Sequence, residues 1–343
     1  MTQAASAHIE TRRVLRCAVC NVEGRKLLQH CRDYLCGLPG EWSFSQCPAC
    51  HSLWLDPAPV ESAIPLLYPD NYRLTRSSTA DSSIFPSGIA GSAKLSILER
   101  RYKYNALEQK ADSQPGLILG RVFGALFVAK AGYSVRFLEK RERGNLLDAG
   151  CGNGDFMALM QQIGWEVHGI ELDPVAARIA MDRGLRVTID NIETVDLPAA
   201  HFDAVTLSHV AEHCTDPPSV LQKLARAVKR GGVLVSLSPN PGGILRHLFG
   251  NRSYGLDPPR HFFLPSERAY RLMLERLGFQ VKTWTSMRLF RWYFKESVSI
   301  AKSKKTGAVS DSFPLRSATA GLAAIFSIWP GIGEEVICYA IKH

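Results

Sequence analysis

From Gly144 onward, short apolar runs alternate with segments of helical periodicity, and this alternation restricts the fold more than any other feature of the sequence. The apolar runs predict strands at 145–149, 166–171, 185–189, 202–208, 233–238, 280–284 and 335–341. The periodic segments predict helices at 155–163, 174–183, 218–229 and 266–277. Strands that alternate with helices form βαβ units, which build a mostly parallel sheet with helices on both faces. The sequence therefore predicts an α/β domain whose ligands bind beyond the carboxyl ends of the strands.

The loop after the first expected strand contains Gly150, Gly152 and Gly154. Glycine lets the backbone turn sharply and approach a ligand closely before the next helix begins. Nicotinamide and flavin folds also use glycine-rich loops, but here Asp155 replaces the third glycine of their GxGxxG pattern. Asp148 lies just ahead of the glycines, and a carboxylate there suits a cationic ligand better than a pyrophosphate.

The run LLDAGCGNGDF, at 146–156, resembles motif I of the class I S-adenosylmethionine-dependent methyltransferases. The similarity continues at Glu171, at 202–205 and at the Glu212-His213 pair. The turn at 228–234 resembles the Lys-Pro-Gly-Gly turn of that family, with arginine in place of proline. The resemblance implies a seven-stranded, mostly parallel, Rossmann-like methyltransferase sheet and an enzyme that uses S-adenosylmethionine.

By this resemblance, the three glycines would line the methionine moiety of the cofactor, and Asp148 would orient its ammonium group. Glu171 would hold the ribose hydroxyls, because a carboxylate can accept two hydroxyl hydrogen bonds. Asn191, in the region where the family places the adenine contact, is carried over as the adenine-binding residue.

Three histidines are the candidates for a catalytic base: His209, His213 and His261. Methyl transfer is an in-line displacement that chiefly needs alignment, but a hydroxyl acceptor also needs a base that titrates near neutrality. The Glu212-His213 pair resembles that of the ubiquinone-biosynthesis O-methyltransferases, in which a divalent metal has been implicated. The alternative for His213 is a residue at a helix start that forms only local hydrogen bonds.

The segment YGLDPPRHFF, at 254–263, resembles a PPRH segment found in a methyltransferase subgroup common in bacterial polysaccharide and secondary-metabolite pathways. It follows the fifth expected strand, so Arg260 and His261 are expected to form one wall of the acceptor site. The alternative is a proline-stiffened loop in which His261 only bonds backbone carbonyls.

Two CxxC pairs near the N-terminus, Cys17/Cys20 and Cys47/Cys50, predict a tetrahedral zinc site. Four thiolate ligands leave no open position for water or substrate, so we expect a structural Zn²⁺. The choice of ligands stays open because three other candidates lie nearby: Cys31, Cys36 and His51.

The composition along the chain indicates four regions. We expect a zinc-ribbon-like module at 1–56, an irregular linker arm at 57–92, a helical lead-in at 93–143 and the methyltransferase domain at 144–343. The expected function is methylation of a small-molecule or saccharide (glycan) acceptor, free or lipid-linked. The alternative is an RNA or protein methyltransferase that uses the zinc module for substrate recognition.

The formal net charge is +9, and basic residues concentrate at 94–143 and 287–305. Basic residues interleaved with aromatic ones suit a peripheral contact with an anionic membrane, and nucleic acid is the less favoured partner. A solvated helix face with aromatic residues in the core is the alternative. The nine cysteines and the polar N-terminus predict a cytoplasmic protein with reduced thiols, in which a membrane contact would be at the inner face.

Overall fold

The computed structural model describes residues 9–69, 88–104, 107–140, 144–303, 318–319, 321–323, 326 and 329–343. Its contacts divide the chain into two compact units. The first unit comprises Met1–Arg73, Ser208–Gln222 and Ser236–Cys338. The second unit comprises Leu74–Leu207, Lys223–Val235 and Tyr339–His343.

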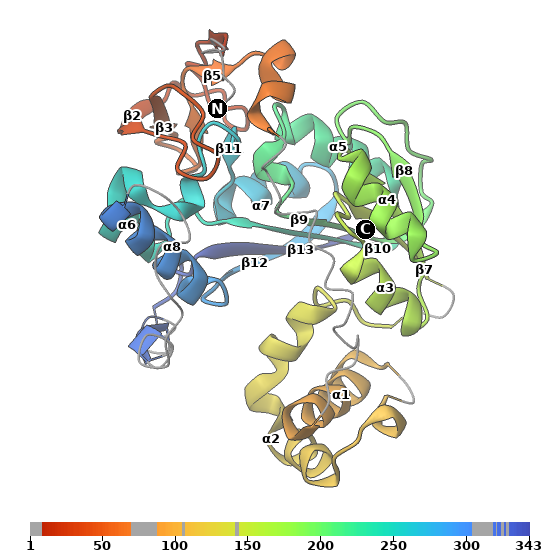
Figure 1. The fold of residues 1–343 in the computed structure, drawn as a ribbon. Coiled ribbons are helices and arrows are strands. Elements are labelled where there is room, and N and C mark those ends of the chain that lie inside the picture. Colours follow the sequence, from red (N-terminus) through yellow and green to blue (C-terminus); the bar gives the residue numbers. More distant parts are fainter. Residues whose placement is uncertain are drawn as a thin grey trace. The chain divides into compact units, whose positions relative to one another are not determined.

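The chain contains a seven-stranded sheet in the order β12-β13-β10-β9-β6-β7-β8 (Figure 1). The strands are β6 (Asn145–Ala149), β7 (Glu166–Glu171), β8 (Arg186–Ile189), β9 (Phe202–Ser208), β10 (Val228–Pro239), β12 (Phe279–Ser286) and β13 (Glu335–Lys342). Each overlaps a strand that the sequence predicts. The predicted α/β fold class, with its Rossmann-like sheet, is therefore confirmed.

The centre of this sheet is parallel, because β6 pairs in parallel with both β7 and β9. Opposite Asp148 lie Gly169 on one side and Thr206 on the other. The chain passes outward from β6 through β7 to β8 and then returns to β9 on the other side of β6. The strand order thus reverses between β6 and β9, where sheets of this kind bind their ligands.

Four of the helices that follow these strands match the predicted ones: α3 (Asp155–Gln162), α4 (Pro174–Asp182), α5 (Pro217–Ala227) and α7 (Glu267–Glu275). Two others, α6 (Ile244–Phe249) and α8 (Phe290–Ser303), have no counterpart in the predicted set. Phe290 and Tyr293 of α8 are buried in a cluster with Leu245 of α6. Two aromatic residues of the basic segment at 287–305 therefore pack in an apolar core.

The second unit also contains two long helices, α1 (Gly88–Tyr102) and α2 (Gln114–Ser134) (Figure 1). They run in the same direction, because Gly116 lies against Ile89 and Gly120 lies against Ala93. A short 3-10 helix, η2 (Glu108–Lys110), lies in the segment between them.

Parts of both basic segments, 141–143 and 304–305, lie outside the described residues. No helix in the part of the chain that the structure describes is both long and apolar enough to span a bilayer.

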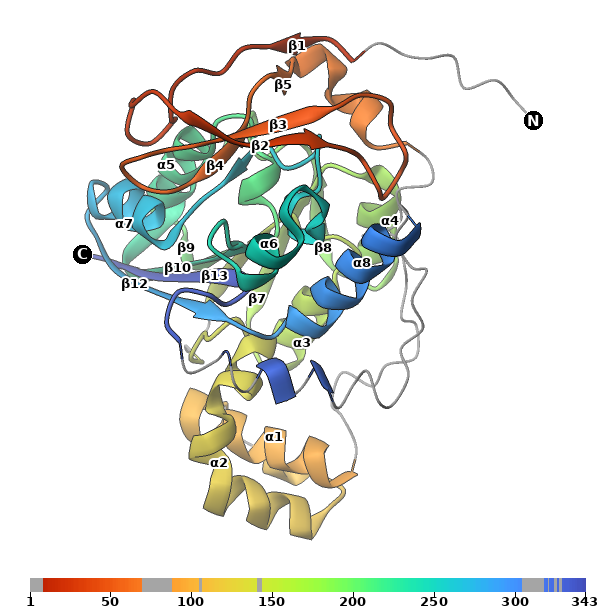
Figure 2. The same cartoon turned by 90° about the vertical axis from the view of Figure 1, so that its left-hand side faces the viewer.

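The first unit contains a four-stranded sheet in the order β11-β4-β3-β2 (Figure 2). Three strands come from the N-terminal region, β2 (Arg25–Cys31), β3 (Trp42–Gln46) and β4 (Leu53–Leu55), whereas β11 (Phe263–Leu264) follows the PPRH segment. Phe262 and Leu264 share a buried cluster with Phe44 and Leu55. The segment expected to be irregular contains β5 (Ala58–Pro59), which pairs with β1 (Thr11–Arg12), and the 3-10 helix η1 (Glu61–Leu67). The N-terminal module thus shares its sheet with a segment from the C-terminal half of the chain.

Gly154, the last glycine of the loop, provides a test of the fold. It has φ +81° and directly precedes α3. A Cβ there would lie 2.9 Å from Cβ of Ala180, so Gly154→Ala meets both a strained backbone and a clash. Gly184 has φ +77°, but no atom of the described residues lies within 4 Å of such a Cβ, so Gly184→Ala meets the backbone strain alone. We expect Gly184→Ala to lower the free energy of unfolding by about 1–2 kcal/mol. Gly154→Ala should lower it by about 1–3 kcal/mol more, measured by urea denaturation. Equal losses in the two variants would contradict this packing.

Candidate functional site

The glycine loop connects β6 to α3 through three residues in the left-handed region. Gly150, Gly152 and Gly154 have φ values of +73°, +56° and +81°. The backbone N–H groups of Gly150 and Cys151 donate to the carbonyl oxygen of Ile170 at 2.8 and 3.0 Å. These bonds hold the start of the loop against the end of β7.

Glu171, the last residue of β7, is fixed by two backbone donors. The N–H of Gly152 donates to its Oε2 at 2.8 Å, and the N–H of Asp173 donates to its Oε1 at 2.9 Å. Burial raises the pKa of Glu171, and these two hydrogen bonds partly offset the rise. Each carboxylate oxygen keeps a lone pair for a further donor.

Asp148, in β6, is fully buried, and its Oδ2 has no hydrogen-bond partner among the described residues. Its Oδ1 accepts hydrogen bonds from Arg136 and from Thr206. Burial raises the pKa of Asp148, whereas the guanidinium of Arg136 acts in the opposite direction. The Arg136 guanidinium also lies 3.6 Å from the centroid of the Phe156 ring. Sequence reasoning missed Arg136, because it lies outside motif I and no local pattern marks it.

Asn191 lies two residues beyond β8. Its Oδ1 accepts a hydrogen bond from the N–H of Glu193 at 2.9 Å, which shapes the turn there. The adenine contact assigned to Asn191 stays a prediction.

His209 directly follows β9 and adopts a left-handed backbone with φ +56°. Its Nδ1 lies 3.2 Å from Oε1 of Glu212, and its Nε2 lies 3.1 Å from Oε1 of Glu335. Burial favours the neutral imidazole, but the two carboxylates outweigh it and raise the pKa of His209 to about 10. His209 is therefore protonated near neutrality, with both N–H groups donating to carboxylates.

His213 and His261 form a pair whose ring centroids are 4.8 Å apart. Nδ1 of His213 lies 3.2 Å from the carbonyl oxygen of Arg260, and Nδ1 of His261 lies 3.0 Å from that of Gly255. A carbonyl can only accept, so the Nδ1–H of each ring is the donor in these two bonds. Burial is the main cause that lowers the pKa of His213 to about 4, so its Nε2 carries a lone pair near neutrality.

Two residues near this pair were not predicted in the positions where the structure places them. The hydroxyl of Tyr68, in the N-terminal region, lies 3.1 Å from Nδ1 of His213. Arg260, expected in the wall of the acceptor site, is fully buried and bonds the carboxylates of Asp33 and Asp257. No local sequence signal connects these residues, because they are far apart along the chain.

Glu212 lies beside the histidine pair and is fully buried. Its Oε2 has no hydrogen-bond partner within the described part of the chain. One ligand atom from each of Glu212, His213 and His261 lies within 4.8 Å of the others, an arrangement that could hold a metal ion. The charge of His209 lowers the pKa of Glu212 against the effect of burial. The cluster therefore offers one carboxylate and two imidazoles in a buried setting.

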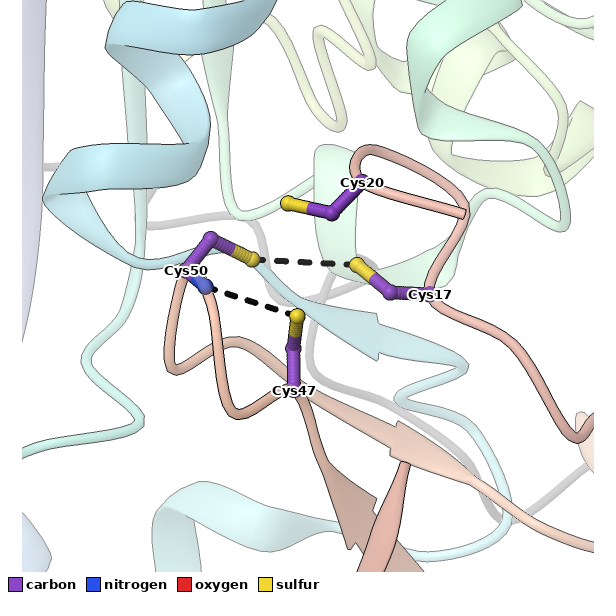
Figure 3. Close-up of side chains that lie close together, drawn as sticks. All are labelled: Cys17, Cys20, Cys47 and Cys50. Carbon is purple, nitrogen blue, oxygen red and sulfur yellow. Dashed lines mark hydrogen bonds between the residues drawn. The ribbon is translucent and has the colours of Figure 1, made fainter. Parts of the chain in front are cut away.

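The four cysteines of the two CxxC pairs converge (Figure 3). The Sγ atoms of Cys17, Cys20, Cys47 and Cys50 all lie within 4.8 Å of one another, which suits a tetrahedral ion. The Sγ atoms of Cys17 and Cys50 are 3.7 Å apart, and the N–H of Cys50 donates to Sγ of Cys47 at 3.4 Å. The three other candidate ligands stand outside this group: Cys31, Cys36 and His51.

Comparisons with known proteins find similarity in the part of the chain that holds the glycine loop. A family model described as a methyltransferase domain matches residues 127–283. The malonyl-[acyl-carrier protein] O-methyltransferase of Serratia marcescens is 36% identical over 124 residues, which cover 35% of this chain and 48% of that protein. The ubiquinone biosynthesis O-methyltransferase of Bordetella avium (strain 197N) is 32% identical over 139 residues, which cover 36% of this chain and 58% of that protein. The chain thus spans about half the length of these curated relatives.

Among solved structures, a SAM-dependent methyltransferase from Archaeoglobus fulgidus is 22% identical, with a TM-score of 0.43. The match covers 65% of this chain and 94% of that one. The family match lies on the strands and the loop that carry motif I, where the sequence resemblance placed it. Residues 127–283, somewhat less than half of the chain, therefore match a methyltransferase domain.

Proposed function

We propose that this protein transfers the methyl group of S-adenosylmethionine to a hydroxyl group of a small-molecule or saccharide acceptor, free or lipid-linked. The observation that carries the proposal is the pair of histidines, His213 and His261, which bond backbone carbonyls through Nδ1; the low pKa of His213 leaves a lone pair on its Nε2. His213 follows β9, the parallel neighbour of the strand that leads into the glycine loop. The two curated relatives compared above are both named O-methyltransferases.

The residues of the glycine loop fit the cofactor chemically. The buried, unpartnered Oδ2 of Asp148 suits the ammonium group of the methionine moiety, because an ammonium is the donor that a buried carboxylate needs. The spare lone pairs of Glu171 suit the two ribose hydroxyls. The glycines allow close approach of the ligand, since they lack a Cβ.

Arg136 complements Asp148 in this proposal. The methionine moiety carries a carboxylate as well as an ammonium, and a guanidinium binds carboxylates in a two-pronged geometry. Arg136 already lies against Asp148 and over the ring of Phe156. We propose that Arg136 binds the carboxylate of the methionine moiety while Asp148 binds its ammonium group. Two neighbouring side chains of opposite charge would then recognise the two charged groups of the cofactor.

When bound, the cofactor supplies a methyl group on a positively charged sulfur, which leaves as a neutral thioether. The protein must align the acceptor with that group and remove the hydroxyl proton. We propose that Nε2 of His213 accepts this proton, because His213 is half-buried whereas His261 is buried. His209 is already charged and held by two carboxylates, so its role is electrostatic.

We also propose that Cys17, Cys20, Cys47 and Cys50 hold a structural Zn²⁺, since four thiolates complete its coordination. The cluster of Glu212, His213 and His261 is the candidate site for an assisting divalent metal, the alternative to an unassisted histidine base.

The rival function is methylation of RNA or protein, with the N-terminal module as a recognition domain. Radiolabelled cofactor offered with separate RNA, protein, saccharide and lipid fractions distinguishes the two. Incorporation into saccharide or lipid supports the proposal, and incorporation into RNA or protein alone overturns it.

Cofactor binding is the first test of the proposed function. Asp148→Asn removes the charge that meets the ammonium while it keeps the shape of the side chain. We expect its dissociation constant for S-adenosylmethionine, measured by calorimetry, to rise at least about tenfold, because a buried charge-assisted hydrogen bond contributes roughly 1.5–3 kcal/mol. Asp155→Asn, on the exposed start of α3, is the control and should bind as the wild type does. No binding by the wild type would remove the enzyme assignment.

The base assignment predicts a pH profile. A base must be neutral to accept a proton, and the pKa of His213 is lowered to about 4. We therefore expect kcat to stay constant as the pH falls from about 7.5 to 5.5, where a histidine of ordinary pKa would lose roughly tenfold. His213→Gln should lower kcat by roughly 10²–10⁴-fold with unchanged cofactor affinity. His247→Gln, on an exposed histidine, should keep full activity. A roughly tenfold fall in kcat by pH 5.5 would contradict the assignment to His213.

Metal content separates the two metal sites. We expect one zinc ion per chain by elemental analysis, lost in Cys47→Ser, because three thiolates hold the ion less tightly than four. Zinc retained at full occupancy in Cys47→Ser would contradict the four-cysteine site. A second divalent ion that His261→Gln releases would favour the metal-assisted reaction over the unassisted base.

A further inference from the structure

We propose that Arg260 is a positioning residue for the histidine pair, and that Asp33 of the N-terminal module holds Arg260 in place. The effect on catalysis rests on the proposed function, whereas the mechanical coupling does not. In this assignment the N-terminal module is part of the framework of the methyl-transfer site and not a separate recognition domain.

The guanidinium of Arg260 is completely enclosed and uses all of its donors. It donates to Oδ2 and Oδ1 of Asp257 at 3.0 and 2.6 Å. It donates to Oδ2 and Oδ1 of Asp33 at 3.0 and 2.6 Å, and to the carbonyl oxygen of Leu67 at 3.3 Å. The side chains of Arg260 and Asp33 are both 0% exposed. Arg260 therefore has one position, set by a carboxylate from each side.

Asp33 is itself fixed by backbone donors. Its Oδ1 accepts hydrogen bonds from the N–H groups of Leu35 and Cys36 at 2.9 and 3.0 Å. Its Oδ2 accepts one from the N–H of Leu38 at 3.1 Å. The carboxylate is thus built into the loop between β2 and β3, and its direction does not depend on Arg260.

The backbone around Arg260 holds both histidines. The Nδ1–H of His213 donates to the carbonyl oxygen of Arg260 at 3.2 Å. The N–H groups of Arg260 and His261 both donate to the carbonyl oxygen of Asp257, at 3.0 and 3.1 Å. A shift of Arg260 would therefore change the acceptor of one imidazole and the backbone that carries the other.

The next residues bind the same segment to the cysteine module. The N–H of Phe262 donates to the carbonyl oxygen of Glu212 at 2.7 Å, and its own carbonyl accepts from the N–H of Leu55 at 3.0 Å. The hydroxyl of Ser266 donates to the carbonyl oxygen of Cys50. The segment that carries His261 is thus bonded to the N-terminal module at two places, at Asp33 and at Cys50.

A buried ion group of this kind needs a reason beyond stability. Removing charges from water costs several kcal/mol per ion, and apolar residues of similar volume often stabilise a fold as well or better. What an arginine between two carboxylates provides is a fixed direction, because its planar fork bonds each carboxylate in a two-pronged manner. Precise placement is what an in-line displacement requires of its base.

The test compares Arg260→Lys and Asp33→Asn with Arg13→Lys. Lysine keeps the charge of Arg260 but cannot bond two carboxylates in forks, and asparagine keeps the shape of Asp33. Arg13 forms a similar two-pronged pair with Asp56 in the same module, at 2.8 and 3.0 Å, with no hydrogen bond to the histidines. Its side chain is 59% exposed, so Arg13 is the control for a two-pronged pair of the same module that lies at the surface, away from the histidines.

We expect Arg260→Lys and Asp33→Asn each to lower kcat at least tenfold, with the dissociation constant for S-adenosylmethionine within twofold of the wild type. The double variant should lose no more than Arg260→Lys alone, because both changes break one connection. Arg13→Lys should keep kcat within twofold. If Arg260→Lys fails to fold, the isosteric Asp33→Asn decides the matter.

Hydrogen exchange gives a readout that needs no activity. The amide of Phe262 should exchange at least tenfold faster in Asp33→Asn than in the wild type, and at an unchanged rate in Arg13→Lys. Unchanged exchange at Phe262, kcat within twofold of the wild type, or equal losses in Arg13→Lys would overturn the proposal. A wild type that binds cofactor and methylates no acceptor would instead contradict the proposed function, and the exchange rates would still decide the coupling.

Discussion

The ion group of Asp33, Arg260 and Asp257 is the interaction on which the arrangement of the first unit depends. It is fully buried at its centre, so neither water nor another side chain can replace a missing partner. Through it, a loop of the N-terminal sheet determines where the PPRH segment lies, and the PPRH segment in turn supplies the acceptor for His213. The four-cysteine module is therefore joined to the histidine cluster by specific bonds as well as by a shared apolar core.

Two kinds of electrostatic design occur in the same chain. In the second unit, Asp148 and Glu171 are carboxylates whose burial favours protonation and whose neighbours favour the charged form. In the first unit, His209 is held charged between Glu212 and Glu335, while His213 is held neutral by burial and by its neighbour His261. Two histidines four residues apart therefore have different charge states, because His209 faces two carboxylates whereas His213 faces a carbonyl, a hydroxyl and another imidazole.

Much of the fold could be predicted, because parallel strands buried on both faces leave continuous apolar runs in the sequence. All seven strands of the main sheet overlap predicted ones. The helix α6 was missed because six residues are too few for a periodic pattern, and the segment of α8 was interpreted from its basic and aromatic residues instead. The sequence also could not show that β11 pairs with β4, since strands of two or three residues carry no periodicity. The glycines of α2 lie four residues apart, at 116 and 120, but the sequence does not show that they pack against α1.

By itself, the sequence determined the glycine loop, the acids at Asp148 and Glu171, and the two CxxC pairs, because each of these depends on residues close together in the chain. Tertiary structure decided which partners those groups meet. Arg136 at Asp148, Tyr68 at His213 and Asp33 at Arg260 are separated from their partners by 12, 145 and 227 residues. Tertiary structure also decided which histidine is charged, since a pKa depends on the burial and the charges around a group and not on its place in the chain.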